Sequence, residues 1–482
     1  MYRTIPIRAK FSVEEKLFWI DQCQNSSSLI NCAIYYTRQK YYTQLEDKGA
    51  NAKSTYWRDN DQYCSSWKTY KCDVSYPELD KALKQSSHYK AMAAQSAQQT
   101  LKTIGESITS YNKLVSLYYK GEVDKPKLPK YRKKGGLAAV TFPRQALNYK
   151  DGYFFPSISK ETKSELLCVI KLELPEFIDS DWVKELTIRP SYGEFWIDWV
   201  IDDGVHPIKK NPHLDYKQAW GFDHGVNNWL TGVSTKGKSF IINGKKLKSI
   251  NQGYSRLVAK YKQGKSNFYW DENLDRIQQK RNNQIRDIVN KTARFIVNRC
   301  LKDQIGNLVI GWNERQKDSA NMGKKINQEF VPFPTKRLIE RVKQLCEEYG
   351  IVFTLTEESY TSKASFLDSD FLPKYGEKPK DWKSSGKRIN RGLYKSSKGH
   401  LINADCNGAC NILRKVTVQL GLNLSNLIKA GSGIMRVPNR YDIFNNLNME
   451  YRKQALRSVA FPRLATSASN PPFLKGGDLK GN

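Results

Sequence analysis

Residues Gly221–Thr231 read Gly-Phe-Asp-His-Gly-Val-Asn-Asn-Trp-Leu-Thr and decide how the fold is interpreted. They place one carboxylate, Asp223, in a short apolar run that ends in glycine, which is typical of a buried strand with an acid at its catalytic end. Far downstream, Asn403–Ile412 supplies a second carboxylate, Asp405, at the start of a helix of small residues. Acids on separate elements can together hold divalent metal for phosphodiester cleavage. The two stretches therefore predict a nuclease centre.

The composition of the 482-residue chain favours a polyanionic partner, because its formal net charge is +31. The length predicts two or three domains. No apolar run of about 18 residues is present, so we expect no membrane-spanning helix, and Met1–Arg8 lacks the apolar core of a secretory signal. The nine scattered cysteines suit a reducing cytoplasm. They include no CxxC pair, which excludes a four-cysteine zinc ribbon.

Hydrophobic periodicity predicts a change of architecture near residue 216. The expected strands cover residues 3–11, parts of 138–201 including a hairpin at 183–201, 218–234, 239–242, 306–312 and 351–356. The expected helices cover 13–42, 79–119, 274–302, 335–349 and 404–416. Because strands and helices alternate after residue 216, we expect a mostly parallel, layered sheet there.

A basic loop at residues 121–136 is a candidate nucleic-acid contact. Two prolines, Pro126 and Pro129, hold it extended. Its candidate phosphate-binding residues are Lys125, Lys127, Lys130, Arg132, Lys133 and Lys134. The alternative is a solvated connector, and the overall charge favours the phosphate-contacting arm.

Each acidic residue also has a purely structural interpretation when it is taken alone. Asp223 can be a solvated residue at a strand-to-turn junction, and Asp405 can belong to a helix N-cap. His224 is a tempting general base, but strand alternation sends its side chain to the face opposite Asp223. We therefore expect His224 to be structural.

Three motifs in order give a family resemblance. Gly221–Thr231 resembles the first RuvC motif of TnpB (OrfB-type) proteins, the relatives of type V CRISPR effectors. Glu358–Lys363 (Glu-Ser-Tyr-Thr-Ser-Lys) is similar to the segment before their zinc ribbon, and Asp405–Ile412 is similar to their last RuvC motif. Pro126–Lys134 also resembles a family stretch. The resemblance covers residues 1 to about 420 and leaves the tail beyond about 430 uncovered.

The resemblance implies a multidomain α/β and β fold, with an RNase H-like (RuvC) nuclease domain and an N-terminal β-barrel-like domain carrying a helical insertion. The expected parts are a barrel-like domain at 1–15 and 120–215, a helical insertion at 16–119, a RuvC domain at 216–363 and 403–425, a basic insert at 364–402, and a tail at 426–482 that is largely disordered towards its end.

The first departure from the family concerns the third metal ligand. The family's usual glutamate ends a strand that here reads Leu308–Trp312, where Gly311 occupies its place. Neighbouring strands lie about 4.8 Å apart, so a carboxylate from the adjacent strand end can reach the same metal. We therefore expect Glu358 to replace the lost glutamate, with Glu357 and Glu314 as alternatives. In the competing interpretation, Glu357 and Glu358 are surface charges at a strand end, and the nuclease activity is lost with the usual glutamate.

The second departure is the missing zinc ribbon, so no zinc is expected. Residues 364–402 are basic instead, and Lys387, Arg388 and Arg391 are candidate nucleic-acid contacts. Without a metal, this insert must be held by packing of its apolar residues, which are Phe366, Leu367, Phe371, Trp382 and Leu393, or be ordered only on nucleic acid. A solvated loop is the alternative.

The activity implied by the resemblance is that of a transposon-encoded, RNA-guided DNA endonuclease that uses Mg²⁺ or Mn²⁺ at Asp223, Glu358 and Asp405. Its partners would be a guide RNA and target DNA, and its place the bacterial cytoplasm. One alternative is a non-cleaving RNA-guided binder, favoured by Gly311. The other is a transposase that acts directly on transposon ends. The absence of the His-x-His motif that such enzymes need argues against it. The sequence leaves the guide RNA, the target-adjacent motif, the oligomeric state and the host open.

Overall fold

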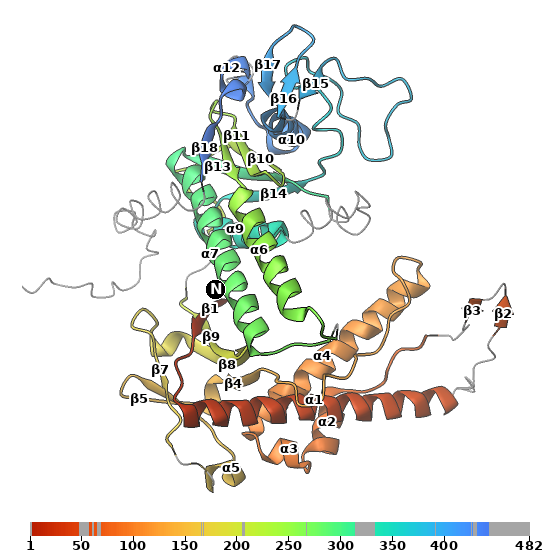
Figure 1. Cartoon of the computed structure of the whole chain (residues 1–482), viewed down its shortest axis with the longest axis vertical. Helices are drawn as coiled ribbons and strands as arrows, with labels where there is room; N and C mark the ends of the chain where they lie inside the picture. The colour runs from red at the N-terminus through yellow and green to blue at the C-terminus, as the bar shows by residue number, and fades with distance from the viewer. Residues whose placement is uncertain are drawn as a thin grey trace, which may run out of the picture. The chain divides into compact units, whose positions relative to one another are not determined.

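The computed structural model divides the chain into two compact units, Met1–His206 and Pro207–Asn482 (Figure 1). The structure describes residues 2–47, 57–59, 62–64, 69–164, 166, 168–204, 208–266, 268–313, 333–390, 392–425, 427 and 431–442. Within these residues no helix is both long and apolar enough to cross a membrane.

The first unit combines two antiparallel sheets with a group of helices. The larger sheet has the order β1-β9-β8-β4, formed by Tyr2–Arg8, Glu194–Asp202, Val183–Ser191 and Val140–Pro143. The smaller sheet has the order β5-β6-β7, formed by Leu147–Lys150, Tyr153–Pro156 and Leu172–Glu173. A short separate hairpin pairs β2 (Trp57–Asp59) with β3 (Gln62–Cys64). These are two sheets rather than a closed ring of strands, so the expected barrel stays a prediction.

The helices of the first unit share one apolar core with its sheets. They are α1 (Val13–Asp47), α2 (Tyr76–Leu83), α3 (Ser87–Lys90), α4 (Ala94–Tyr119) and the short α5 (Lys160–Ser164). Trp19 of α1 stacks edge-on against Phe142 of β4, which joins helix and sheet. The single helix expected at 79–119 is wrong. The chain breaks there because Ser86 caps α3, accepting a hydrogen bond from the Tyr89 N–H.

The second unit contains a six-stranded mixed sheet with the order β14-β13-β10-β11-β12-β18. Its strands are Val352–Thr356, Ile305–Gly311, Asp215–His224, Asn228–Ser234, Ser239–Asn243 and Asn439–Tyr441 in that order. β10, β11 and β12 form an antiparallel meander. β13 pairs parallel with both β10 and β14, and β18 pairs parallel with β12. Three of the five strand pairs are thus parallel, as the expectation of a mostly parallel sheet requires, and the meander adds two antiparallel pairs.

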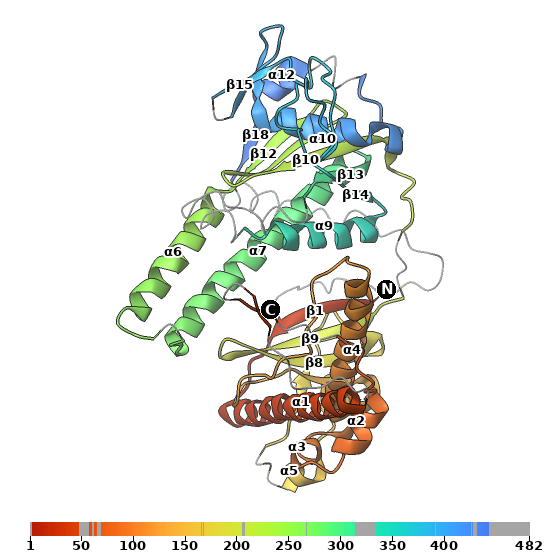
Figure 2. The same cartoon turned by 90° about the vertical axis from the view of Figure 1, so that its right-hand side faces the viewer.

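Helices cover both faces of this sheet (Figure 2). They are α6 (Lys245–Lys262), α7 (Glu272–Lys302), α9 (Thr335–Tyr349), α10 (Ala404–Leu420) and the short α12 (Gly431–Arg436). α7 and α9 pack against Trp220, Phe222 and Leu308, while α10 packs against the opposite face at Ala219 and Val309. Because side chains alternate along a strand, this division sends odd-numbered residues of β10 towards α10.

Close packing of α10 on β10 depends on Gly221. A Cβ added there would lie 2.4 Å from the Leu413 Cγ and 3.0 Å from the Ala409 carbonyl oxygen. Only glycine allows this approach, because any side chain would push the helix away from the strand. Since Asp223 lies two residues further along β10, the contact brings it close to the start of α10, where Asp405 lies.

A small antiparallel sheet precedes α10 in the sequence. It has the order β15-β16-β17, formed by Lys387–Asn390, Leu393–Lys395 and Leu401–Asn403. β17 runs directly into α10, so this sheet and the helix that carries Asp405 are continuous. The basic insert predicted at 364–402 is thus folded over much of its length.

Candidate metal centre

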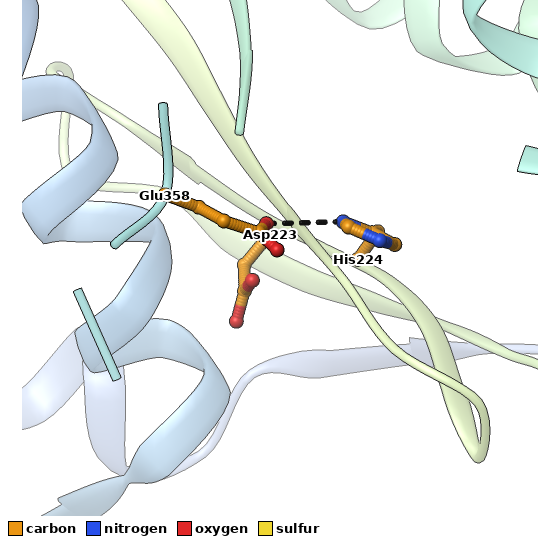
Figure 3. Close-up of side chains that lie close together, drawn as sticks. All are labelled: Asp223, His224 and Glu358. Carbon is orange, nitrogen blue, oxygen red and sulfur yellow. Dashed lines mark ion pairs between the residues drawn. The ribbon is translucent and has the colours of Figure 1, made fainter. Parts of the chain in front are cut away.

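Asp223, His224 and Glu358 form one side-chain cluster at the end of β10 (Figure 3). One ligand atom from each of the three lies within 4.8 Å of the others. The His224 Nδ1 is 3.2 Å from the Glu358 Oε2, in an ion pair whose side chains are only 5% and 10% exposed. Among the described residues, this is the cluster in which three potential ligands meet. It contains two of the three carboxylates that the sequence singled out.

Gly311 leaves the space through which Glu358 approaches the cluster. β13 lies between β10 and β14, with Phe222 opposite Ile310 and Gly311 opposite Thr356. A Cβ added at Gly311 would lie 3.3 Å from the Glu358 Cβ. The stem of Glu358 therefore begins beside the place where a side chain at position 311 would begin. A glutamate at either position would enter the same region.

Asp405 lies in the first turn of α10, where hydrogen bonds hold both its backbone and its carboxylate. The helix is capped by Asn403, whose Oδ1 accepts hydrogen bonds from the N–H groups of Asp405 and Cys406, both at 3.0 Å. Asp405 is therefore not the cap itself. Its Oδ2 accepts a 2.6 Å hydrogen bond from the Asn228 Nδ2. The position also suits a negative charge, because the N-terminal end of a helix is electropositive.

The electrostatics of the cluster favour a cation. Burial and the nearby charge of Glu358 raise the pKa of Asp223 to about 8; the charge of His224 opposes this rise, and Asp405 makes a smaller contribution to it. Burial works to lower the pKa of His224, but its contact with Glu358 and the charge of Asp223 raise it overall. A negative charge on Asp223 is thus unfavourable near neutral pH, where the carboxyl group keeps its proton, and a bound cation would favour the ionised form.

The donor set fits a divalent metal ion. Carboxylate oxygens are the ligands that Mg²⁺ and Mn²⁺ prefer. Thr231 pairs directly with Asp223 across the sheet. Thr231 is only 1% exposed, and its hydroxyl has no hydrogen-bond partner among the described residues. A buried hydroxyl needs a partner, and water held at an ion beside Asp223 would supply one.

The two alternative glutamates have different outcomes. Glu357 turns towards α10, where its Oε2 lies 3.3 Å from the Lys415 Nζ. Although burial opposes the shift, hydrogen bonding with Ser359 and the charge of Lys415 lower the pKa of Glu357. Its carboxylate is therefore engaged elsewhere, while that of Glu358 reaches the cluster. Glu314 lies outside the described residues.

Hydrogen bonds from two aspartates hold the insert together without cysteine. The Asp370 Oδ2 accepts from the N–H groups of Ser365 at 2.7 Å and Ser385 at 3.0 Å. The Asp368 Oδ2 accepts from the Ser365 hydroxyl at 2.6 Å and the Ser397 N–H at 2.8 Å. Each carboxylate thereby joins chain segments that are far apart in sequence. These contacts occupy the structural place in which the family resemblance implies a zinc ribbon.

Packing of the insert differs in part from the expectation. Phe366 is buried as expected, but Phe371 is 65% exposed and takes no place in the core. Tyr394 is buried instead, and its hydroxyl donates to the Lys363 carbonyl at 2.9 Å. Asn407 ties the insert to α10, accepting from the Phe366 N–H at 2.9 Å and donating to the Ala364 carbonyl at 2.8 Å.

The basic arm is attached to α1 while its charged side chains face outward. Asn31 donates to and accepts from the backbone of Arg132, at 3.2 Å and 2.8 Å. Arg38 donates to the Pro129 carbonyl at 2.9 Å and lies over the Tyr131 ring. The predicted phosphate-binding residues all have exposed side chains, namely Lys125, Lys127, Lys130, Arg132, Lys133 and Lys134. Their role in nucleic-acid binding stays a prediction.

The candidate basic residues of the insert lie near the acidic cluster. Lys387 and Arg388 are exposed on β15, and the Arg388 guanidinium is 3.5 Å from the Asp405 Oδ1. Arg391 lies outside the described residues. Arg388 is thus the one residue of this set that the structure brings into contact with a candidate metal ligand.

Sequence reasoning missed several members of the site. Asn228 holds Asp405, and it lies within the quoted stretch Gly221–Thr231, where an amide beside the turn was the available signal. His224 was assigned to the opposite face, but at the end of the strand its ring meets Glu358 beyond the edge of β13. Arg440, on the three-residue strand β18, lies 3.5 Å from the Asn228 Oδ1. No sequence signal pointed to it.

Comparison with known proteins gives one sequence match and several structural likenesses. Residues 205–316 match the OrfB_IS605 family, described as a probable transposase. No curated protein matches the chain. The chain is similar to that of a Cas12f1-sgRNA-target DNA complex, at 13% identity and a TM-score of 0.46 over 83% of each chain. It is also similar to the mini-RNA-guided endonuclease CRISPR-Cas_phi3, at 10% identity and a TM-score of 0.40 over 86% of this chain and 92% of that one.

TM-scores of this size do not by themselves establish a shared fold, so the sequence match is the stronger result. The matched segment contains Asp223, His224 and Gly311, which are the residues that define the strand end of the cluster. The resemblance predicted from the motifs is thereby confirmed for this part of the chain: residues 205–316 match the OrfB_IS605 family of probable transposases.

Proposed function

We propose that this protein is an RNA-guided DNA endonuclease that hydrolyses phosphodiester bonds at a divalent-metal centre formed by Asp223, Glu358 and Asp405. The observation that carries the proposal is the approach of Glu358 to Asp223 beside Gly311. A carboxylate from the end of β14 enters the region that a side chain on β13 would otherwise fill. The chain thus retains a third acidic group even though the usual glutamate is absent.

The order of the strands supports an RNase H-like nuclease domain. An antiparallel meander, β12-β11-β10, is followed by the parallel strands β13 and β14. Asp223 lies at the end of the central strand, and Asp405 opens a helix that packs against the same face. Ligands often bind near the carboxyl ends of parallel strands, where such side chains converge.

The residues of the chain have separable parts in this site. When bound, Mg²⁺ or Mn²⁺ would polarise the phosphate and generate the attacking hydroxide. Glu358 is oriented by its ion pair with His224. Asp405 is oriented by Asn228, which holds one carboxylate oxygen and leaves the other open towards Arg388. Fixed partners of this kind keep ligands in place and are typical of metal centres.

The proposed macromolecular partners are a guide RNA and target DNA. The formal net charge of +31 and the exposed arm at Lys125–Lys134 supply the positive charge that binding a nucleic-acid backbone requires. Recognition of the target by base pairing follows from the TnpB resemblance. A non-cleaving RNA-guided binder is the second candidate, and the specific observation in its favour is Gly311.

Cleavage of plasmid DNA by the protein purified with its co-expressed RNA tests the proposal. Asp223→Asn and Asp405→Asn should each abolish cleavage in Mg²⁺ and in Mn²⁺ and leave RNA binding unchanged, because they remove ligands and no phosphate-contacting surface. Asp381→Asn, an exposed acid in the insert, is a matched control that should cleave normally. Cleavage by either active-site variant at the wild-type rate would refute the metal centre. Absence of cleavage by the unmodified complex would favour the non-cleaving binder.

A further inference from the structure

Arg440 shares the face of the sheet on which Asp223 lies. Four residues stand opposite one another across neighbouring strands: Asp223 pairs with Thr231, Thr231 with Ile241, and Ile241 with Arg440. Directly paired residues project from the same face of a sheet. Arg440 therefore projects on the side of α10. At about 4.8 Å per strand, roughly 14 Å of sheet separates its backbone from that of Asp223.

The strand that carries Arg440 is fixed in place by its neighbour in sequence. Tyr441 points to the opposite face, where its ring packs against Phe295 and Phe240 at centroid distances of 4.9 Å and 5.9 Å. Its hydroxyl accepts a 2.6 Å hydrogen bond from the Arg299 guanidinium. Tyr441 thus anchors β18, and alternation along the strand turns Arg440 towards the metal centre.

Two arginines from separate elements meet at Asp405. The Arg388 guanidinium is 3.5 Å from the Asp405 Oδ1, and its side chain is 45% exposed. The Arg440 NH1 is 3.5 Å from the Asn228 Oδ1, while the Asn228 Nδ2 holds the other Asp405 oxygen at 2.6 Å. Both arginine contacts lie at the long limit for hydrogen bonding. The two guanidinium groups are therefore loosely held and open to solvent.

Arg440 has no ion pair with a carboxylate among the described residues, and the hydrogen-bond partner of its guanidinium is the neutral amide of Asn228. An exposed guanidinium with free donors beside a phosphodiesterase site matches the geometry of a phosphate oxygen pair.

We infer that Arg440 and Arg388 form a phosphate-binding subsite for the DNA strand that enters the metal centre, holding the phosphate next to the one at Asp223. The inference rests on the proposed function, and it assigns a binding role to β18, which lies beyond the part of the chain that the TnpB resemblance covers. DNA would reach the carboxylates with its neighbouring phosphate already neutralised, which orients the strand across the face of the sheet.

Binding of single-stranded DNA by a cleavage-deficient protein tests the subsite without relying on activity. We would measure the affinity of the Asp223→Asn protein, with its RNA, for an oligodeoxythymidine and for the same strand with uncharged methylphosphonate linkages. Adding Arg440→Gln should weaken binding to the charged strand by about three- to tenfold and reduce the salt slope by about 0.7 per lost phosphate contact. It should leave binding to the uncharged strand unchanged.

Two further variants make the outcome specific. Arg436→Gln removes an exposed arginine four residues away on α12 and should not alter either affinity. Tyr441→Ala keeps the charge of Arg440 but removes the anchor of β18, so it should reproduce the loss seen with Arg440→Gln. Equal losses for Arg436→Gln and Arg440→Gln, or equal losses on both strands, would overturn the subsite. Absence of cleavage by the wild-type complex would refute only the proposed function, because this binding test does not depend on it.

Discussion

Replacing Glu358 by glutamine is the sharpest test of the metal centre, because Gln keeps the size of the side chain and removes its charge. Groups that only support metal ligands are worth about 10- to 100-fold in activity, so the loss of a ligand should slow cleavage by more than about 100-fold. The melting temperature should change little, because loss of the Glu358 charge relieves Asp223, whose pKa that charge raises, while the new amide can still hydrogen-bond to His224. Cleavage rate and melting temperature should therefore move independently.

A carboxylate restored at position 311 should rescue the cleavage that Glu358→Gln loses. A Cβ added at Gly311 would lie 2.5 Å from the Ile412 Cδ1, about 1 Å closer than an ordinary contact. Gly311→Glu alone should therefore disturb α10. Ile412→Val removes that methyl group at a cost of about 0.5–1.5 kcal/mol. In the Glu358→Gln background, the pair Gly311→Glu and Ile412→Val should restore at least tenfold of the lost cleavage, because the new carboxylate enters the same region.

The assay is guide-dependent cleavage of plasmid DNA in Mg²⁺ and Mn²⁺, followed as single-turnover rates. The matched control carries Gly311→Gln in place of Gly311→Glu, which fills the same volume without a charge and should rescue nothing. Wild-type cleavage by Glu358→Gln would refute the assignment of Glu358. Equal rates for the Glu and Gln variants at position 311 would show that the two positions do not serve the same metal.

Two further predictions concern proton linkage and the basic arm. Because the pKa of Asp223 is about 8 in the folded protein and 3.8 ordinarily, the folded state retains a proton that the unfolded state releases. The stability of the metal-free protein should therefore fall as pH rises between these values, and Mn²⁺ affinity should rise over the same range. Both trends can be followed by thermal melting, and both should flatten in Asp223→Asn. Neutralising Lys130, Arg132, Lys133 and Lys134 together should weaken RNA binding and reduce its salt slope, whereas an unchanged slope would show that the arm does not contact phosphate.

The parts of the fold that the sequence predicts are those with strong periodicity or glycine-bounded apolar runs. β10, β13, α7, α9 and α10 lie where the pattern placed them. α6 was not predicted, since its Lys-rich sequence has few apolar positions to mark a buried face. β18 was not predicted because three residues are too short to show alternation. Its position depends on Tyr441 packing against distant residues, which no local pattern reports.

In the site, too, residues marked by their local sequence could be predicted, whereas those fixed by long-range contacts could not. Asp223 and Asp405 are marked by their own surroundings, a strand end and a helix start. The choice of Glu358 over Glu357 depends on the partners of each side chain, His224 in one case and Lys415 in the other. Alternation alone assigned His224 to the opposite face. It did not predict the contact because Glu358 comes from beyond the end of β14 and approaches beside Gly311, which has no side chain.

The aspartate-held insert changes what removal of metal would do to this protein. Asp368 and Asp370 join its segments through serine and backbone N–H groups. The insert, residues 364–402, contains no cysteine. A chelator should therefore strip the catalytic ion while the insert stays folded, and re-addition of the ion should restore the starting state. Titrations with different ions would then report on the cluster at Asp223 alone, uncoupled from any structural metal. Oxidants that dismantle cysteine-bound zinc should likewise leave this segment untouched.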